Sequence, residues 1–198
     1  MSTVKQDIFN LPNSLTMLRI IIIPAVMYLM HLGDPTSCMI SALLFTAAAV
    51  TDYLDGYIAR KRGLVSITGK FLDPLADKLI VMAVLLMLVQ NQHMPAWLCA
   101  IVLGREISIT ALRALASTEG IVMAAQSGGK YKTAFQLIGL LGMIIHYEYV
   151  IDWFLVSDRV NFHAVGFIIF GVSVFFSLWS GFKYSYDFIR GIDQVKKG

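Results

Sequence analysis

Residues 161–182 read NFHAVGFIIFGVSVFFSLWSGF, a stretch that contains no Asp, Glu, Lys or Arg. A transmembrane helix needs roughly 20 predominantly apolar residues, so this stretch predicts a membrane span. The composition agrees, because 57% of the 198 residues are hydrophobic and only 15% are charged. Soluble domains carry about 25% charged residues. With a net charge of only +3, the chain is predicted to be an integral membrane protein, not a soluble enzyme or a nucleic-acid-binding protein.

Five further stretches are apolar enough to span a membrane if a few embedded charges are tolerated. The six predicted spans are about Leu15–Leu32, Met39–Ile58, Gly69–Val89, Pro95–Ala116, Lys132–Ile151 and Asn161–Phe182. Turn-like residues separate the spans, among them Gly33-Asp34-Pro35 and Ser157-Asp158-Arg159. We therefore predict an all-α integral membrane protein with a single domain, residues 1–198. Residues 1–14 are expected to form a short interfacial segment and residues 183–198 a cytoplasmic tail.

The basic residues predict the orientation of this bundle. If the six spans alternate in direction, both termini lie on the same side of the membrane, and nearly all Lys and Arg residues of the loops and termini lie on that side. The loops on the other side contain only Arg159. Lys and Arg are enriched in cytoplasmic loops, so both termini are predicted to be cytoplasmic. The charges embedded in the spans fall on the same side, which predicts a polar cavity open to the cytosol.

Four aspartates are the most informative of these embedded charges. Asp52 and Asp55 are three residues apart, and Asp73 and Asp77 are four apart, so each pair shares one helical face. Like charges in such positions repel each other unless a cation lies between them. Carboxylates suit Mg²⁺ or Mn²⁺ better than zinc, and two-metal sites recur in phosphoryl chemistry. The pattern predicts a site for two divalent cations.

The residues around the aspartates fit a phosphate ligand. Small residues allow a close approach, and a guanidinium matches phosphate oxygens. The residues in question are Gly56, Ala59, Gly69 and Arg60. The pair Asp73-Pro74 also predicts a helix start that directs backbone N–H groups at an anion. At the start of the first span, one helical face carries Asn13, Thr16 and Arg19, which either contact the phosphate ligand or, for the first two, serve as polar groups at the helix start.

The segment Asp52-Tyr-Leu-Asp55-Gly56-Tyr-Ile-Ala59-Arg60, followed by Gly69, Asp73 and Asp77, resembles the signature of the CDP-alcohol phosphotransferases at all eight fixed positions. The resemblance implies a six-helix membrane enzyme that displaces CMP from a CDP-linked alcohol with a second alcohol, and it suggests a homodimer. It also implies that the four aspartates hold two Mg²⁺ or Mn²⁺ ions and that Asp77 acts as general base. The remaining signature residues, Gly56, Ala59, Arg60 and Gly69, are then expected to shape the CDP pocket.

Three other stretches are similar to one branch of that family, the bacterial phosphatidylglycerophosphate synthases. They are residues 11–19, residues 104–113 and residues 129–136. This similarity implies a multi-pass enzyme of the bacterial cytoplasmic membrane whose active site faces the cytosol. Its substrates are expected to be CDP-diacylglycerol and sn-glycerol 3-phosphate, and its products phosphatidylglycerophosphate and CMP. Membrane lipids are the remaining expected partners.

A phosphorylated acceptor is an anion and needs cations beyond those that neutralise CDP. The candidates on the cytoplasmic side of the fourth and fifth spans are Arg105, Arg113, Lys130 and Lys132. Alternatively, the arginines pair structurally with Glu106, and the lysines serve membrane topology or contact lipid headgroups.

Two other functions remain open at this point. The same chemistry could use serine, inositol phosphate or phosphatidylglycerol as the acceptor. A divalent-cation transporter could use the aspartate cluster as its transport site, although a transporter needs polar groups in both halves of the membrane and the outer half here is nearly free of charges.

Overall fold

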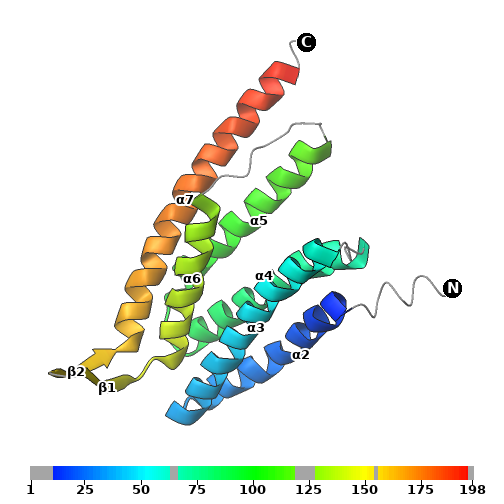
Figure 1. Ribbon diagram of the computed structural model, residues 1–198. Helices are drawn as coiled ribbons and strands as arrows, with labels where there is room; N and C mark the ends of the chain where they lie inside the picture. The colour runs from blue at the N-terminus through cyan, green and yellow to red at the C-terminus, as the bar shows by residue number, and fades with distance from the viewer. Residues whose placement is uncertain (1–10, 63–66, 119–127, 154–155, 196–198) are drawn as a thin grey trace.

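The computed structural model describes residues 11–62, 67–118, 128–153 and 156–195. Within these ranges the chain forms helices and one β-hairpin (Figure 1). The elements are α2 (Leu11–Leu32), α3 (Pro35–Arg62), α4 (Ile67–Gln90), α5 (Ala96–Thr118), α6 (Gly128–Ile145), β1 (Glu148–Trp153), β2 (Val156–Asn161) and α7 (Phe162–Val195). The structure thus confirms the predominantly helical class that the sequence predicts.

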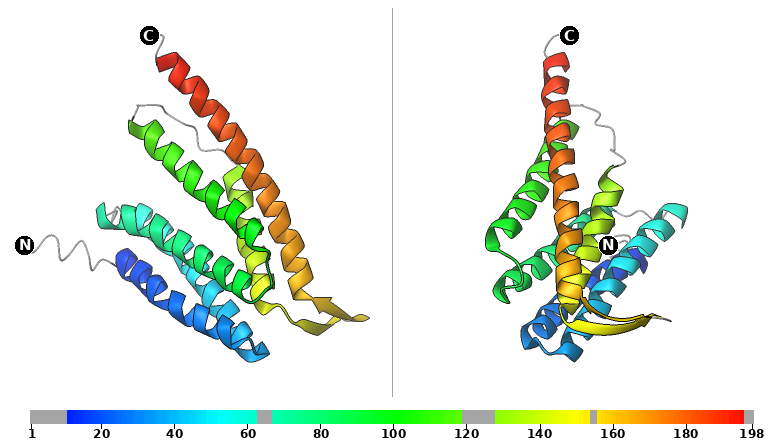
Figure 2. Two further views of the ribbon diagram at one scale, coloured as in Figure 1. Left: turned by 180° about the vertical axis from the view of Figure 1, so that it is seen from behind. Right: turned by 90° about the vertical axis from the view of Figure 1, so that its left-hand side faces the viewer.

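The helices run up and down between two ends of the molecule. The start of α2 and the end of α7 lie at one end, called here the terminal end, together with the ends of α3 and α5 (Figures 1 and 2). The β-hairpin and the α2–α3 turn lie at the other, called the hairpin end (Figure 1). Helices α2, α3 and α4 pack together, while α6 packs mainly against α7 and also contacts α3.

Local sequence explains the first of these turns. Gly33 ends α2 with a φ of 73°, a left-handed conformation that suits glycine after a helix. Asp34 then caps α3, because its Oδ2 accepts a hydrogen bond from the backbone N–H of Ser37 at 2.9 Å. The predicted break at Gly33-Asp34-Pro35 is therefore confirmed.

The hairpin was not predicted. Strands β1 and β2 pair antiparallel, in a register that runs from Glu148↔Asn161 to Trp153↔Val156. Helix α6 stops at Ile145, short of the predicted Ile151, and the next residue, His146, has a φ of 49°. Residues 149–153 are rich in β-branched and aromatic side chains, which favour strands. The predicted break around residues 157–159 thus lies within a strand, not in a simple turn.

Helix α7 is longer than its apolar stretch. It continues as helix from Phe182 to Val195, through most of the segment expected as a tail. Among the described residues, two helical segments are long and apolar enough to cross a membrane by length and composition, Ser14–Leu32 and Phe162–Ile192. Shorter apolar stretches cover Pro35–Thr51 and Lys132–Ile145. These helices fit a membrane protein, and the count of six spans stays a prediction.

Helices α6 and α7 cross at backbone distance. A Cβ atom added to Gly166 would lie 2.7 Å from the carbonyl oxygen of Gly139, and one added to Gly142 would lie 2.9 Å from the Cα of Gly166. Small residues at a helix crossing allow such close packing inside a membrane. Fully buried side chains on both sides of this contact, among them Leu140, Met143 and Phe170, continue the core toward α2 and α4.

Three histidines meet at the hairpin end. The rings of His93 and His146 are 4.0 Å apart between centroids, and those of His93 and His163 are 5.5 Å apart. The ring Nε2 of His163 lies 2.8 Å from the backbone carbonyl oxygen of His93, within hydrogen-bond distance. In the described part of the chain, no group of three His, Cys, Asp or Glu residues has an arrangement that could hold a metal ion. The cluster therefore joins the α4–α5 turn to the chain on either side of the hairpin.

Candidate functional site

Helix α4 presents its first aspartate to α2. The hydroxyl of Thr16 donates a hydrogen bond to Oδ1 of Asp73 at 2.6 Å, and Thr16 is completely buried. Thr16, predicted either as a ligand contact or as a polar group at the helix start, thus donates to a carboxylate of the signature. Helix α4 begins at Ile67 and contains Pro74 in its interior. The prediction of a helix start at Asp73-Pro74, with N–H groups directed at an anion, was therefore wrong.

Arg19 brings a buried guanidinium to α3. Arg19 is 2% exposed, and its Nε donates a hydrogen bond to the backbone carbonyl of Ala48 at 3.3 Å. Ala48 precedes Asp52 by four residues in the same helix, which is about one turn. A cation from α2 therefore lies against α3 about one turn before its first aspartate.

Several predicted residues have side chains outside the described set. They are Asn13, Asp52, Asp55, Gly56, Ala59, Arg60, Gly69 and Lys130. Their backbone positions still matter, because Asp52 and Asp55 lie in the second half of α3 and Asp73 and Asp77 lie in the first half of α4. Both pairs thus belong to the terminal-end halves of two helices that contact each other. The convergence of all four carboxylates stays a prediction.

A partly buried ion-pair network links α5 to α6. Lys132 of α6, which is 7% exposed, pairs through its ammonium with the carboxylate of Glu106 on α5. The Nη1 of Arg105 lies 3.2 Å from the same carboxylate oxygen. Two of the predicted acceptor-binding cations are thus brought together, and they share one anion.

Arg105 also fastens α5 to α7. Its Nε donates to the backbone carbonyl of Ser177 at 2.9 Å, and its Nη2 donates to the hydroxyl of Ser180 at 2.7 Å. All three guanidinium nitrogens therefore have protein partners. This arrangement supports the structural alternative for Arg105, since its hydrogen bonds position α7 and its charge remains close to Lys132.

A second group of cations lies further along α5. The guanidinium carbon of Arg113 lies 5.3 Å from the ring centroid of Tyr184 on α7. The ammonium of Lys78, on α4, donates to the hydroxyl of Thr110. Sequence reasoning identified Lys78 as an embedded charge without giving it a role, and Thr110 carried no signal at all. Their contact depends on how α4 and α5 are rotated, which periodicity does not reveal.

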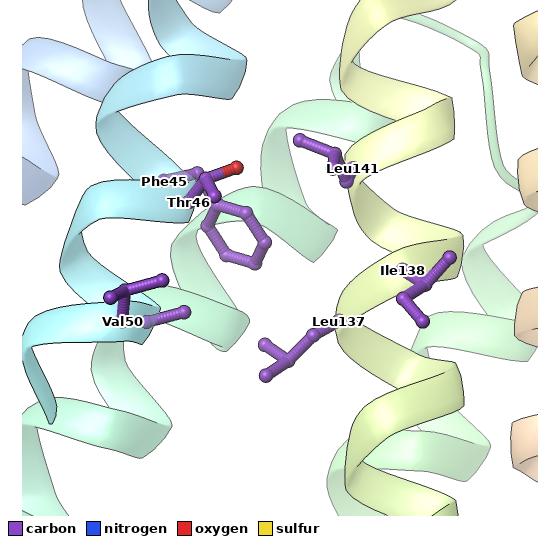
Figure 3. A pocket seen from close by; sticks show the side chains of 7 residues that line it. Phe45, Thr46, Val50, Leu137, Ile138 and Leu141 are labelled. Carbon is purple, nitrogen blue, oxygen red and sulfur yellow. The ribbon is translucent and has the colours of Figure 1, made fainter. Parts of the chain in front are cut away.

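An apolar groove lies between α3 and α6 (Figure 3). Its volume is about 310 Å³, and it is lined by Phe45, Thr46, Ala49, Val50, Leu137, Ile138 and Leu141. The one hydroxyl in this lining, that of Thr46, donates to the backbone carbonyl of Ala42 at 2.8 Å, so its hydrogen bond is satisfied within its own helix. The last lining residue on α3, Val50, precedes Asp52 by two residues in the sequence.

Comparison with known proteins agrees with this arrangement. A family model described as CDP-alcohol phosphatidyltransferase matches residues 9–179. The match covers most of the chain and includes every predicted site residue, so the chain belongs to the CDP-alcohol phosphatidyltransferase family and is a transferase.

The most similar relatives include several bacterial enzymes, each named CDP-diacylglycerol–glycerol-3-phosphate 3-phosphatidyltransferase. The protein from Bacillus subtilis is 40% identical over 188 residues, covering 89% of this chain and 93% of the relative. The protein from Haemophilus influenzae is 35% identical over 181 residues, covering 89% and 91%. The protein from Rickettsia bellii is 34% identical over 175 residues, covering 88% and 93%. The similarity extends over nearly the full length of both partners.

Proposed function

We propose that this protein transfers the phosphatidyl group of CDP-diacylglycerol to sn-glycerol 3-phosphate, releasing CMP and forming phosphatidylglycerophosphate. The family assignment and the names of the relatives support this reaction. The observations that carry the proposal within the structure are that Thr16 holds Asp73 of α4 and that Glu106 of α5 brings Lys132 and Arg105 together. Carboxylates for a divalent cation and cations for an anionic acceptor are thus present on adjoining helices.

The four aspartates are proposed to hold two Mg²⁺ or Mn²⁺ ions. The described members fit this role, because Asp73 and Asp77 share one face of α4 and carboxylate oxygens are preferred ligands of these ions. When bound, such ions neutralise the diphosphate and stabilise the departing CMP. On this proposal Asp52 and Asp55 of α3 complete the set.

In the proposed reaction, the 1-hydroxyl oxygen of the acceptor attacks the phosphorus that is joined to diacylglycerol. The bond from that phosphorus to the CMP oxygen breaks, and its electron pair leaves with CMP. Asp77 accepts the hydroxyl proton. Because aspartate is a weak base at neutral pH, the positioning of the two substrates contributes more to the rate than proton abstraction does.

The nucleotide is proposed to lie against the end of α3 and the start of α4. Small residues admit the CDP backbone, and cationic or polar groups from α2 and α3 contact it. The proposed CDP-binding residues are Gly56, Ala59, Arg60, Gly69, Asn13 and Arg19. Thr16 is reassigned from nucleotide contact to the support of Asp73, because its hydroxyl proton is donated to that carboxylate.

The acceptor phosphate is proposed to bind near Arg113, Lys130 and Lys132. Arg105 contributes its positive charge to this region while its hydrogen bonds go to α7 and Glu106. A dianionic phosphate is stabilised by several cations in a poorly hydrated site. Serine, a zwitterion without a phosphate, would not need them.

One acyl chain of the lipid substrate is proposed to occupy the α3–α6 groove. The groove is apolar, lies within the apolar stretches of both helices, and begins two residues from the signature segment. A lipid whose CDP group binds at the aspartates therefore finds an apolar surface for its chain directly beside them. Figure 3 shows Phe45, Val50 and Leu137 on facing helices around this space.

The proposed setting is the bacterial cytoplasmic membrane, with six spans, a homodimeric assembly, and the terminal end in the cytoplasm. The excess of Lys and Arg in the terminal-end segments supports this orientation. Accessibility of cysteines introduced on each side of the membrane in intact cells tests it.

The proposed reaction is tested with purified protein, CDP-diacylglycerol, Mg²⁺ and an equimolar mixture of acceptors. Mass spectrometry of the lipid products should show phosphatidylglycerophosphate. A product formed from serine, inositol phosphate or phosphatidylglycerol would identify another acceptor within the family. Metal flux into liposomes without release of CMP would instead support a transporter.

A further inference from the structure

One face of α5 receives a lysine from each of two neighbouring helices. Glu106, Thr110 and Arg113 follow one another at spacings of four and three residues, so they lie on the same face of α5. Lys132 of α6 pairs with Glu106, and Lys78 of α4 donates to Thr110 one turn further along. Helices α4 and α6 therefore each contribute an ammonium group to one face of α5.

The two lysines differ in what they contact. Lys132 meets a carboxylate, so its charge is balanced where it lies. Lys78 meets a neutral hydroxyl, so no carboxylate balances its charge at this contact, and the neighbouring Asp77 is the anion that acts on it. Thr110 uses its own proton to donate to the backbone carbonyl of Glu106 at 2.7 Å, so its oxygen is oriented to accept from Lys78. The hydroxyl therefore fixes the position of an ammonium without neutralising it.

The surroundings of Lys78 are suited to an anion. Arg113 follows Thr110 by three residues on the same face of α5, and its guanidinium contacts the face of a tyrosine ring. Lys78 is exposed, although it lies in the first half of a helix that belongs to the membrane domain. An accessible charge at such a position faces a polar cavity and marks a substrate path more often than it faces lipid. An ammonium has three donors, of which Thr110 takes one.

We propose that Lys78 binds the phosphate group of the acceptor, with Arg113 beside it, and that Thr110 positions the ammonium for this contact. The inference rests on the proposed function and adds a specificity-determining residue to it. Lys78 directly follows Asp77 on α4, and neighbouring residues of a helix project about 100° apart at 3.6 residues per turn. The two side chains therefore hold the two ends of a short acceptor, the phosphate on Lys78 and the reacting hydroxyl on Asp77.

A phosphate ligand of Lys78 has two possible sources, the acceptor and the diphosphate of the CDP-lipid. Steady-state kinetics of Lys78→Met, with each substrate varied in turn, separates them. Loss of a hydrogen bond to a charged group predicts a KM for glycerol 3-phosphate that is roughly 10- to 100-fold higher. The KM for CDP-diacylglycerol should stay unchanged. A rise in the KM for the CDP-lipid, a fall in kcat alone, or unchanged kinetics would each overturn the inference.

Three further variants complete the experiment. Lys183→Met removes an exposed lysine of α7 and should behave as wild type. Thr110→Val should raise the KM for glycerol 3-phosphate less than Lys78→Met does, because the ammonium is retained but no longer held. Lys78→Arg keeps the charge and should recover part of the affinity, and it replaces Lys78→Met as the test if Lys78→Met does not fold. Wild-type affinity for glycerol 3-phosphate in Thr110→Val, together with no binding in Lys78→Arg, would contradict the proposed geometry.

Equilibrium binding of radiolabelled glycerol 3-phosphate to the folded variants, without CDP-lipid, provides a readout that is independent of turnover. Lys78→Met should bind it more weakly, and equal binding by wild type and variant would overturn the inference. If the wild-type protein forms no product from glycerol 3-phosphate, the proposed function itself fails. If wild type is active and Lys78→Met matches it, only the role of Lys78 fails.

Discussion

The hydroxyl of Thr16 lies 2.6 Å from Oδ1 of Asp73, and this hydrogen bond joins α2 to α4 across 57 positions of sequence. The donor is completely buried, and the acceptor belongs to the aspartate signature. A fixed donor of this kind limits the rotation of the carboxylate and presents its second oxygen to the site. On the proposed function, the contact makes α2 part of the active site, although α2 contains no acidic residue.

Thr16→Val should weaken metal binding without unfolding the protein. A hydrogen bond to a charged group contributes about 1.5–3 kcal/mol, so affinity for Mn²⁺ is expected to fall roughly 10- to 100-fold. Mn²⁺ titration followed by electron paramagnetic resonance measures this affinity without turnover. Thr16→Ser should restore it, and Thr118→Val, which removes an exposed hydroxyl at the end of α5, should leave it unchanged. Equal Mn²⁺ affinity in Thr16→Val and wild type contradicts the positioning role.

Asp77→Asn should abolish most of the turnover. The amide cannot accept the hydroxyl proton and binds a divalent cation poorly, so kcat is expected to fall by about 10²- to 10⁴-fold. Initial rates of CMP release measure the effect, and an unchanged melting temperature shows that the variant is folded. Glu148→Gln, in the hairpin, is the matched control. Wild-type activity in folded Asp77→Asn would refute the assigned role.

Ala49→Phe should fill the α3–α6 groove and discriminate between lipid substrates. The added ring occupies the space proposed for an acyl chain, so kcat/KM should decline for long-chain CDP-diacylglycerol more than for a short-chain analogue. Ala47→Phe is a close control, since Ala47 lies two residues away on α3, is exposed, and does not line the groove. An equal loss with both lipids would place the acyl chain elsewhere.

Acidification should destabilise the hairpin end. Burial and the neighbouring His146 and His163 lower the pKa of His93 to about 4 from its ordinary value of 6.5. The folded protein then binds fewer protons than the unfolded chain between these values, so stability is complete above about pH 6.5 and is lost as the pH falls toward 4. Melting temperatures measured across this range should fall with acid in wild type.

His93→Gln provides the comparison for this pH effect. The variant keeps a polar side chain but does not titrate, so its melting temperature should depend less steeply on pH than that of wild type. Carboxylates elsewhere titrate equally in both proteins, and the difference between the two curves isolates the histidine. Parallel curves would show that His93 does not control this part of the stability.

Hydropathy predicts the helices well where apolar residues continue to the helix end. The ends of α2 and α4 agree with the sequence to within a residue, because Gly33 and the polar residues after Gln90 mark them. Hydropathy did not predict the secondary structure where an apolar segment is not helical or a polar segment is. Ile151 is apolar but belongs to a strand, and Lys183 is charged but continues a helix.

Spacing along the chain predicts which charges share a helix face but not which face meets which neighbour. The pairing of Asp73 with Asp77 follows from their spacing, whereas the contact of Lys78 with Thr110 depends on the packing of two helices. Arg105 shows the same limit, since its partners on α7 are uncharged groups, the backbone carbonyl of Ser177 and the hydroxyl of Ser180. Residue type predicted the chemistry of the site, and tertiary packing decided the partners.

The glycine crossing of α6 and α7 has a consequence for how a lipid enters. A lipid with two acyl chains that enters laterally from the bilayer must pass through a gap between two helices. Where Gly166 of α7 contacts Gly139 and Gly142 of α6, the two helices leave no room for even one methylene group, so a lipid cannot pass between them there. On the proposed function, the lipid would therefore enter on the opposite flank of α6, which contacts α3 and carries the apolar groove.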